Sequence, residues 1–372
     1  MTEAQVKTSP RGQSPERRGS ANGGRRRDFH RLTVKRVERL TDDSAAITFA
    51  VPSGLADAFA FAAGQTLTVR RGAERRTYSI CAPVGAAPRI GVREVAGGAV
   101  SGWLVHSLQA GDTLEVQVPS GTFTPDLSVP GHHVLIAAGS GITPMMSIAA
   151  SVLAADPAST VTLLYGNRRS DTVMFADEVA DLKDAYPARM QLVHVLSREP
   201  QEVALFSGRL DAQRLTELLP VTVDVASVDH WWLCGPFAMV TDAIGVLRSL
   251  GVDQARIHRE LFWVGDDPPV TATHEEAPAG DGVGLTVILD GRSSTLTLPP
   301  GTPILDGAQR SRPDLPFACK GGVCGTCRAK IVTGQAVMRR NYALEQPEID
   351  AGYVLTCQAL PQTNEITVNY DA

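Results

Sequence analysis

Four of the six cysteines in this chain lie close together near its C-terminal end, and no other feature constrains the fold as strongly. Cys319, Cys324 and Cys327 share the short loop CKGGVCGTC, and Cys357 follows in GYVLTCQ. The first residues are polar and lack the apolar core of a secretory signal, so we expect a cytoplasmic protein. In that compartment a cysteine cluster indicates a metal site rather than a disulfide framework.

The spacing Cys-x4-Cys-x2-Cys with a distant fourth cysteine is typical of plant-type [2Fe–2S] sites. Gly321, Gly322 and Gly325 permit the unusual backbone angles that bring three thiolates together, and they bring N–H groups close to the sulfurs. A structural zinc site is the alternative, but zinc modules usually use two C-x-x-C pairs or add histidines. The last histidine is His274, so a histidine-containing zinc site and a Rieske centre are both disfavoured. The predicted cluster ligands are Cys319, Cys324, Cys327 and Cys357.

Composition is that of a globular protein, with 43% hydrophobic and 20% charged residues in a chain of 372, enough for two to three domains. Residues 1–28 hold seven Lys and Arg against three Asp and Glu, a net of +4, which leaves −9 for the remainder of a chain of net charge −5. We expect this tail to be disordered, with an anionic or nucleic-acid contact through Arg25, Arg26 and Arg27 as the alternative. The acidic body disfavours nucleic acid as a partner.

No stretch of the sequence approaches the ~20 apolar residues of a membrane span, so we expect no membrane partner.

Residues 29–130 consist of short alternating runs separated by turns. Only one helix is indicated, near residues 101–108. Six antiparallel strands with tight connections predict a small β-barrel. The strand-like runs are RLTVKRVE, AAITFAV, QTLTVR, RTYSI, RIGVRE and DTLEVQV.

The pattern changes at residue 131. Through residue 263, apolar strand-like runs (HVLIAA, VTLLYG, MQLVHVL, HWWLCG) alternate with segments of helical periodicity, which predicts a parallel sheet covered on both faces. Residues 264–283 are rich in Pro, Gly and acidic residues without periodicity and predict a linker. Residues 284–372 begin with two alternating runs joined by Asp-Gly, which predicts a β-hairpin.

Residues 284–372 resemble plant-type ferredoxins, and residues 29–263 resemble the ferredoxin–NADP reductase superfamily. Their order resembles that of the reductases of multicomponent bacterial oxygenases. Within that group, CKGGVCGTCRAK, NYALE and GYVLTCQALP are similar to the reductase subunits of phenylacetyl-CoA 1,2-epoxidases. Reductases of steroid ring hydroxylases share the domain order and are the alternative. The resemblance implies a multidomain fold: an antiparallel β-barrel flavin domain, an α/β parallel-sheet nicotinamide domain and an α+β ferredoxin domain of the β-grasp type.

The same resemblance implies an NAD(P)H-dependent oxidoreductase that passes electrons from NADPH through FAD and a [2Fe–2S] cluster to a diiron oxygenase. NADH and FMN are the alternative cofactors. A redox sensor without turnover is a different class of function, and the intact loops for hydride transfer argue against it. The candidate residues for the surface that meets the oxygenase are Arg339, Arg340, Asn341 and Tyr342.

In this superfamily an R-x-Y-S stretch at the end of a barrel strand binds flavin, and Arg76, Thr77, Tyr78 and Ser79 match it. An arginine can pair with pyrophosphate oxygens, and a tyrosine offers a flat ring to the isoalloxazine or ribityl region. Ser79 would hydrogen-bond the reactive N5 edge. The alternative is that RTYS is one more amphipathic strand.

A glycine-rich turn then feeds the predicted helix, and such a turn is a ready anion site. Arg93 ends the run GVRE, and Gly97, Gly98 and Ser101 follow in GGAVS. The superfamily uses this element for the flavin pyrophosphate.

Two loops are expected beside the nicotinamide ring. Gly139, Gly141, Thr143 and Pro144 belong to GSGITP, which follows a strand and opens a helix but is not the G-x-G-x-x-G fingerprint. Thr143 would contact the nicotinamide through its hydroxyl. The second loop is Cys234-Gly235-Pro236, whose cysteine would otherwise be a small buried apolar residue.

Arg168 and Arg169 follow the second strand of the nicotinamide domain and would receive a 2′-phosphate; two solvated side chains are the alternative. Glu260 and Phe262 in HRELFW stand where the superfamily brings an acid and an aromatic ring to the flavin. Phe262 would shield the flavin, or it closes the core of its domain. The predicted catalytic residues are Ser79, Thr143, Cys234 and Phe262.

Overall fold

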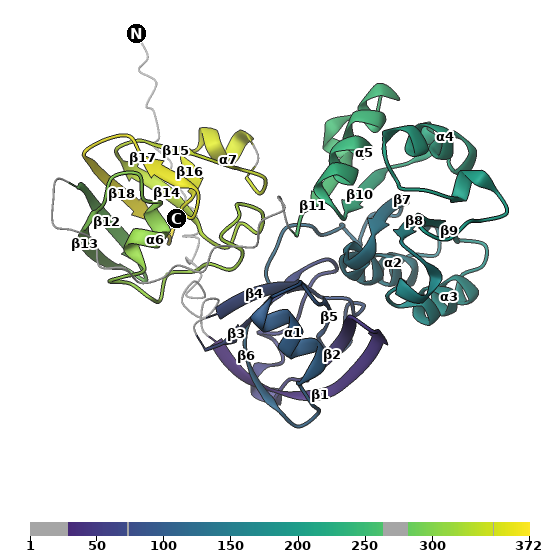
Figure 1. The fold of residues 1–372 in the computed structure, drawn as a ribbon, viewed down its shortest axis with the longest axis horizontal. Coiled ribbons are helices and arrows are strands. Elements are labelled where there is room, and N and C mark those ends of the chain that lie inside the picture. Colours follow the sequence, from purple (N-terminus) through teal and green to yellow (C-terminus); the bar gives the residue numbers. More distant parts are fainter. Residues whose placement is uncertain (1–28, 73, 263–281, 345) are drawn as a thin grey trace, which may run out of the picture.

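The structure, a computed structural model, describes residues 29–72, 74–262, 282–344 and 346–372. The predicted tail 1–28 and all but the last two residues of the predicted linker lie outside these residues. Figure 1 shows three parts: a barrel in purple and blue, an α/β part in teal and green, and a C-terminal part in light green and yellow. Among the described helices, none combines the length and the apolar character that crossing a membrane requires.

The first part is a six-stranded antiparallel sheet with the strand order β4–β3–β6–β1–β2–β5. An antiparallel bridge between Ile80 and Ile90 closes the sheet into the predicted barrel. Inward and outward side chains alternate, as in β1, where Leu32 and Val34 are buried between exposed neighbours. The elements are β1 (Phe29–Thr41), β2 (Ser44–Ala50), β3 (Thr66–Arg71), β4 (Glu74–Ser79), β5 (Arg89–Arg93), α1 (Ala99–His106) and β6 (Thr113–Gln117).

The second part is a five-stranded parallel sheet with the order β11–β10–β7–β8–β9. Successive side chains of β7 point to opposite faces, so Val134 and Ile136 pack in the core with α4 and α5, whereas Leu135 and Ala137 pack with α2 and α3. The elements are β7 (His132–Ala138), α2 (Ile142–Ala155), β8 (Thr160–Asn167), α3 (Ala176–Ala185), β9 (Met190–Leu196), α4 (Ala212–Thr222), β10 (His230–Cys234), α5 (Phe237–Ser249) and β11 (Ile257–Glu260).

β11 is a strand that the sequence pattern did not predict. Its residues, IHRE, are mostly polar because the strand lies at the edge of the sheet and only one of the four residues, Ile257, is fully buried. The strand matters because it carries Glu260 to the end of the sheet beside Cys234, its partner in the register with β10.

The third part is a mixed sheet with the order β13–β12–β18–β14–β16, in which β12 and β18 are parallel and the other pairs antiparallel. Asp290 and Gly291 form the predicted hairpin turn, with φ angles of 54° and 69°. The elements are β12 (Val283–Leu289), β13 (Arg292–Leu298), α6 (Ile304–Ala308), β14 (Arg328–Thr333), β15 (Ala336–Met338), α7 (Gln346–Asp350), β16 (Tyr353–Leu355), β17 (Ala359–Pro361) and β18 (Glu365–Asn369).

Side chains connect the three parts. Arg89 of the barrel pairs with Glu178 of α3 at 2.7 Å. The ring of Phe237, at the start of α5, meets that of Tyr342 edge-on with centroids 5.3 Å apart. Val323, in the cysteine loop, is buried in the hydrophobic cluster that contains α4 and α5. The cysteine loop therefore lies against the second part of the molecule.

Candidate redox site

The four clustered cysteines lie as two pairs. Hydrogen bonds join the thiol of Cys319 to that of Cys324, and the thiol of Cys327 to that of Cys357. In the described part of the chain no group of three or more His, Cys, Asp or Glu side chains is arranged to hold a single ion. Four cysteines that lie as two pairs can be shared between the two irons of a binuclear cluster.

The loop favours the thiolate form of one cysteine, Cys319. Its pKa is lowered to about 6: the hydrogen bond from Cys324 is the largest cause, backbone N–H groups of the loop including that of Gly321 add to it, and burial opposes them. The N–H of Gly321 donates to the Cys319 sulfur at 3.3 Å. A thiolate is the form that ligates iron, so these hydrogen bonds favour the ligating form of Cys319.

Backbone geometry and two hydrogen-bonded side chains hold the loop in place. Gly322 has a φ of 82°, a conformation that strains other residues, and a Cβ there would lie 3.1 Å from the Gln358 side chain, a close contact that adds to the preference for glycine. Gln358 donates to the Lys320 carbonyl at 2.7 Å. Thr356 donates to the Cys327 carbonyl at 2.9 Å and accepts from the buried hydroxyl of Tyr370 at 2.8 Å.

On the barrel side, the last residue of β4 meets the last residue of β11. The hydroxyl of Ser79 donates to Glu260 Oε2 at 2.9 Å, and Ser79 is 2% exposed. Burial raises the pKa of Glu260 to about 7, and the Ser79 hydrogen bond opposes only part of that rise. Burial, and then the Glu260 carboxylate, raise the pKa of Cys234 well above its ordinary value. This shift disfavours the thiolate of Cys234, the form in which a cysteine acts as a nucleophile.

The two predicted nicotinamide loops pack backbone against backbone. A Cβ on Gly141 would lie 2.0 Å from the Cys234 carbonyl oxygen, and a Cβ on Gly235 would lie 2.6 Å from the Met239 side chain. Thr143 donates to the Ser140 carbonyl at 3.0 Å, and its methyl group would be 2.4 Å from a Cβ on Gly91 of β5. Glycines thus bring the two loops and the barrel together without side chains between them.

The remaining residues of these loops lie at helix starts. Pro144 is buried in the first turn of α2, where the missing N–H leaves no helix hydrogen bond unmade. Pro236 precedes the first residue of α5. Phe262 is half-buried and packs against the hydrophobic cluster that includes α2 and Cys234. Both of its predicted roles, flavin shield and core residue, fit this position.

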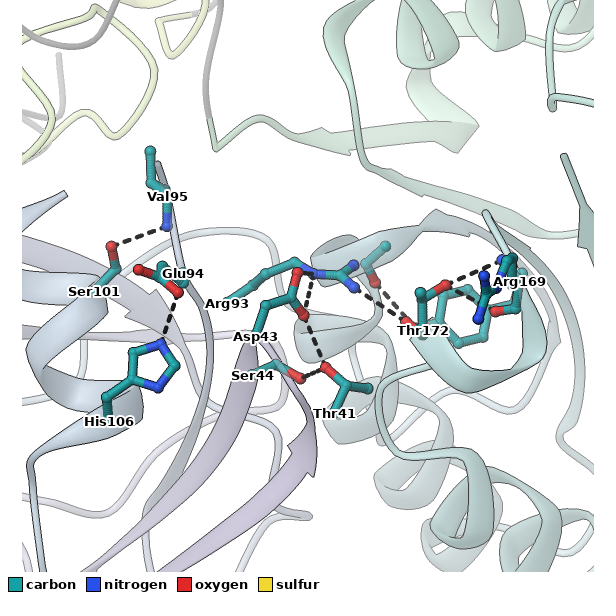
Figure 2. A network of polar contacts seen from close by, with 12 residues as sticks. Thr41, Asp43, Ser44, Arg93, Glu94, Val95, Ser101, His106, Arg169 and Thr172 are labelled. Atoms are coloured by element: carbon teal, nitrogen blue, oxygen red, sulfur yellow. Dashed lines mark hydrogen bonds and ion pairs between the residues drawn. The ribbon is translucent and has the colours of Figure 1, made fainter. Parts of the chain in front are cut away.

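The two arginines predicted to meet phosphate groups are engaged with carboxylates. Arg76 pairs with Glu74 at 2.8 Å. Arg93 pairs with Asp43 at 2.9 Å and also donates to the Thr172 carbonyl at 3.1 Å, so it connects the barrel to the α/β part, as Figure 2 shows. Although burial opposes it, the hydrogen bond from Arg93 lowers the pKa of Asp43.

The glycine-rich turn before α1 is stabilised internally by Ser101. Its hydroxyl accepts from the Val95 N–H at 3.0 Å, a contact visible in Figure 2, and donates to the Gly98 carbonyl at 3.4 Å. Gly97 has a φ of 73°, and a Cβ on Gly98 would lie 2.6 Å from the Ser101 hydroxyl. The Ser101 hydroxyl is thus used within the turn. A pyrophosphate bound here would contact the backbone N–H groups at the start of α1.

Thr77 and Tyr78 complete the R-x-Y-S stretch. Thr77 is within hydrogen-bond distance of Thr68 at 3.1 Å on the neighbouring strand β3. Tyr78 packs beside the barrel core, and burial raises the pKa of its hydroxyl. Its neutral, half-buried ring is a flat surface next to Ser79.

Arg168 lies just after β8, exposed to solvent. Its carbonyl accepts from the N–H of Arg198, also exposed, at 2.8 Å. Neither guanidinium forms an ion pair with any described residue, whereas the adjacent Arg169 pairs with Asp171. Two unpaired cations therefore stand at the carboxyl ends of neighbouring strands, the edge of a parallel sheet where ligands bind.

Three protein-family models match successive parts of the chain. The oxidoreductase FAD-binding domain matches residues 31–124, the oxidoreductase NAD-binding domain matches residues 135–244, and the 2Fe-2S iron-sulfur cluster binding domain matches residues 287–362. The predicted succession of cofactors is confirmed.

Two curated relatives cover nearly the whole chain. One subunit of the 1,2-phenylacetyl-CoA epoxidase of Escherichia coli (strain K12) is 42% identical over 92% of this chain and 98% of its own length. The ferredoxin reductase component of 3-ketosteroid-9-alpha-monooxygenase from Rhodococcus rhodochrous is 33% identical over 91% and 96%. The chain belongs to the family of oxygenase reductase components. The reductase also resembles the crystal structure of phthalate dioxygenase reductase, with 24% identity, a TM-score of 0.57, and coverage of 92% of this chain and 98% of that one, which supports the fold.

The family confirms the predicted class of reaction. The reductase is an oxidoreductase that transfers electrons with a nicotinamide cofactor, FAD and a [2Fe–2S] cluster. The roles of individual residues stay predictions. Sequence analysis did not anticipate Arg75, Thr356 or Tyr370, because their partners are backbone carbonyls or distant hydroxyls, which leave no motif.

Proposed function

We propose that this reductase supplies a phenylacetyl-CoA epoxidase with electrons from NADPH. The observation that carries the proposal is the 42% identity to the epoxidase subunit from Escherichia coli, which spans 98% of that protein. The related reductase of the steroid monooxygenase is 33% identical over a similar span, and it supplies the second candidate function. Domain boundaries at residues 29–130, 131–263 and 284–372 are part of the proposal.

At the hydride site, FAD would accept a hydride from the nicotinamide and release its electrons singly to the cluster. Ser79 and Glu260 form a hydrogen-bonded pair there. A buried carboxyl group with a pKa of about 7 can hold or release a proton near neutral pH, which suits a reaction that moves electrons and protons together. Thr143 and Cys234 would line the place for the nicotinamide ring, and Phe262 would cover it.

The phosphates of the cofactors would bind at backbone turns and arginines. The turn Gly97–Gly98 with the start of α1 offers N–H groups, and Arg76 and Arg93 offer guanidinium groups that now hold Glu74 and Asp43. Arg93 would keep its hydrogen bond to the Thr172 carbonyl and would donate its remaining N–H groups to a phosphate oxygen.

NADPH is preferred over NADH in this proposal because of Arg168 and Arg198. Their unpaired guanidinium groups at the carboxyl end of the sheet suit a 2′-phosphate. With Arg168→Ala, KM for NADPH should rise about tenfold or more, while KM for NADH should hardly change. Equal changes for both nucleotides would assign specificity to other residues.

Reconstitution with the oxygenase subunits tests the whole proposal. The purified reductase, NADPH and the oxygenase subunits of a phenylacetyl-CoA epoxidase should form epoxide with NADPH consumed in proportion. The oxygenase of a 3-ketosteroid 9α-hydroxylase serves as the matched alternative. Turnover only with the steroid oxygenase would replace the first candidate by the second, and turnover with neither would refute both.

A further inference from the structure

Arg75 of β4 is a buried cation whose contacts lie in the ferredoxin part. It is 7% exposed, and among the described residues its guanidinium forms no ion pair with a carboxylate. Instead, Nη1 donates to the Leu315 carbonyl at 2.9 Å, and Nη2 donates to the Pro313 carbonyl at 3.2 Å. A buried charge of this kind costs free energy unless hydrogen bonds and cation–π contacts replace its water.

Two aromatic rings supply the cation–π contacts. The guanidinium carbon lies 5.3 Å from the ring centroid of Phe29 in the barrel and 4.8 Å from that of Phe317 in the ferredoxin part. One ring comes from each side of the interface, and both lie within the distance at which a cation is attracted to a ring face. Both parts therefore contribute contacts to the guanidinium when they are docked, and within the described residues only its Nε is left without a hydrogen-bond partner.

The position of Arg75 along the chain connects the two redox sites. It lies on β4 four residues before Ser79 and on the same face of the strand, about 13 Å along it. On the other side of the interface, Leu315 and Phe317 lead directly to the cluster ligand Cys319. A shift in the contacts of Arg75 would move the cluster relative to the hydride site.

We propose that Arg75 is a positioning residue that docks the ferredoxin domain for electron transfer from the flavin to the cluster. The inference rests on the electron path of the proposed function. The Arg75 side chain contacts neither the cluster cysteines nor the predicted flavin residues, and only its main-chain carbonyl accepts from Arg76 at 2.7 Å, a bond that a side-chain substitution keeps. Its substitution should therefore affect the step between the two sites and leave each site intact. Leu315 and Pro313 contribute main-chain carbonyls, so the docking depends on the arginine and on the backbone path rather than on a paired side chain.

The test compares Arg75→Ala with Arg70→Ala in the full-length holoprotein. Arg70 is the matched control because it also stacks on Phe29, at 4.2 Å, but its ion pair is with Glu115, a partly exposed residue of the barrel part itself. Stopped-flow mixing with NADPH under anaerobic conditions follows flavin bleaching and cluster bleaching separately. In Arg75→Ala, flavin reduction should keep its wild-type rate while cluster reduction slows about tenfold or more. In Arg70→Ala both rates should stay near wild type.

Arg75→Lys keeps the charge and the alkyl stem but cannot span both carbonyls, so its rate should fall between those of wild type and Arg75→Ala. The electron paramagnetic resonance spectrum of the chemically reduced cluster should be unchanged in all variants.

If Arg75→Ala fails to retain flavin, Arg75→Lys is the variant that tests the inference. A wild-type rate of cluster reduction in the variant that retains flavin, or equal slowing in Arg70→Ala, would overturn the inference. Failure of NADPH to reduce the flavin of the wild-type protein would instead refute the proposed function.

Discussion

The flavin barrel meets its two neighbours in different ways. Toward the nicotinamide domain it presents Ser79, hydrogen-bonded to the half-buried Glu260, and Gly91, which leaves room for Thr143. Toward the ferredoxin domain it presents one buried arginine, whose partners are two main-chain carbonyls and an aromatic ring. The first interface includes residues that motifs predicted, such as Ser79 and Thr143, whereas the second depends on a residue that belongs to no motif.

This difference follows from what each interface must do. The hydride step requires reacting groups at fixed distances, so it restricts residue types at many positions. Docking the ferredoxin domain requires only that two parts meet with the right orientation, and the linker already supplies a high effective concentration. A carbonyl partner allows many sequences in the segment around Pro313, which explains why that contact leaves no signature.

The largest expected effect tests whether the cluster can be lost while the hydride site keeps working, that is, whether the two interfaces are separable. Cys327→Ser removes one member of the buried Cys327–Cys357 pair, so the protein should lose its iron and acid-labile sulfide completely. Flavin reduction by NADPH should keep at least about half of its rate, because the hydrophobic clusters of the barrel and of its junction with α2 and α3 contain no residue of the ferredoxin part. Metal analysis and stopped-flow spectroscopy measure the two results. Cys81→Ala, a buried cysteine of the barrel, is the control and should retain the cluster. Loss of flavin reduction together with iron would contradict separability.

Much of the fold followed from the sequence, for physical reasons that particular residues illustrate. Alternation in RLTVKRVE indicates which side chains of β1 face the barrel interior, and Asp290-Gly291 indicates the hairpin turn between β12 and β13. The edge strand β11 was missed because IHRE is too short and too polar to show periodicity. Among the site residues, the cysteine spacing identifies the cluster, but only the fold shows that Arg76 and Arg93 hold carboxylates and that Arg75 holds the ferredoxin domain.

The next effect concerns the motif-built interface. Gly141→Ala places a Cβ 2.0 Å from the Cys234 carbonyl, and a backbone atom cannot give way as a flexible side chain can. We expect a loss of about 3 kcal/mol in the stability of the nicotinamide domain and a marked rise in KM for NADPH. Urea unfolding and steady-state kinetics measure these changes.

The control is Gly245→Ala in α5, where an added Cβ has no heavy atom within 4 Å; this variant should stabilise the helix by up to about 1 kcal/mol. Equal effects of the two variants would show that the loop tolerates a side chain.

A smaller effect depends on pH. The pKa of Glu260 rises from 4.5 to about 7 on folding, so between these values the folded protein holds a proton that the unfolded chain has released. Stability should therefore fall as pH rises from about 4.5 to 7, by about 2–3 kcal/mol from this group. Glu260→Gln should remove that part of the fall, which urea unfolding at pH 5 and pH 8 measures. Glu202→Gln, at an exposed position, should keep the wild-type dependence. A Glu260→Gln protein with an unchanged pH dependence would show that the carboxyl group is ionised in the folded state.

The smallest expected effect sharpens the account of the second interface. Tyr342 was a candidate for the surface that meets the oxygenase, yet its ring contacts Phe237 of the nicotinamide domain, centroid to centroid at 5.3 Å. An edge-to-face pair contributes about 0.5–1.5 kcal/mol beyond its buried area. Phe237→Ala should therefore slow flavin-to-cluster transfer by roughly twofold to tenfold, less than Arg75→Ala.

Comparison with Tyr342→Ala separates docking within the chain from docking to the oxygenase. If the tyrosine serves only the internal interface, both variants should slow cluster bleaching equally and leave electron transfer from the reduced cluster to the oxygenase unchanged. The control is Leu250→Ala, a substitution of an exposed apolar residue just after α5, which should leave both rates unchanged.

A slower transfer to the oxygenase in Tyr342→Ala alone would show that the ring also contacts the oxygenase. The ferredoxin domain would then have to leave the nicotinamide domain before it delivers its electron. The contact with Phe237 would then belong to the state that receives electrons, and its weakness would be an advantage, because an interface that must open in each cycle cannot be as tightly built as the one between Ser79 and Glu260.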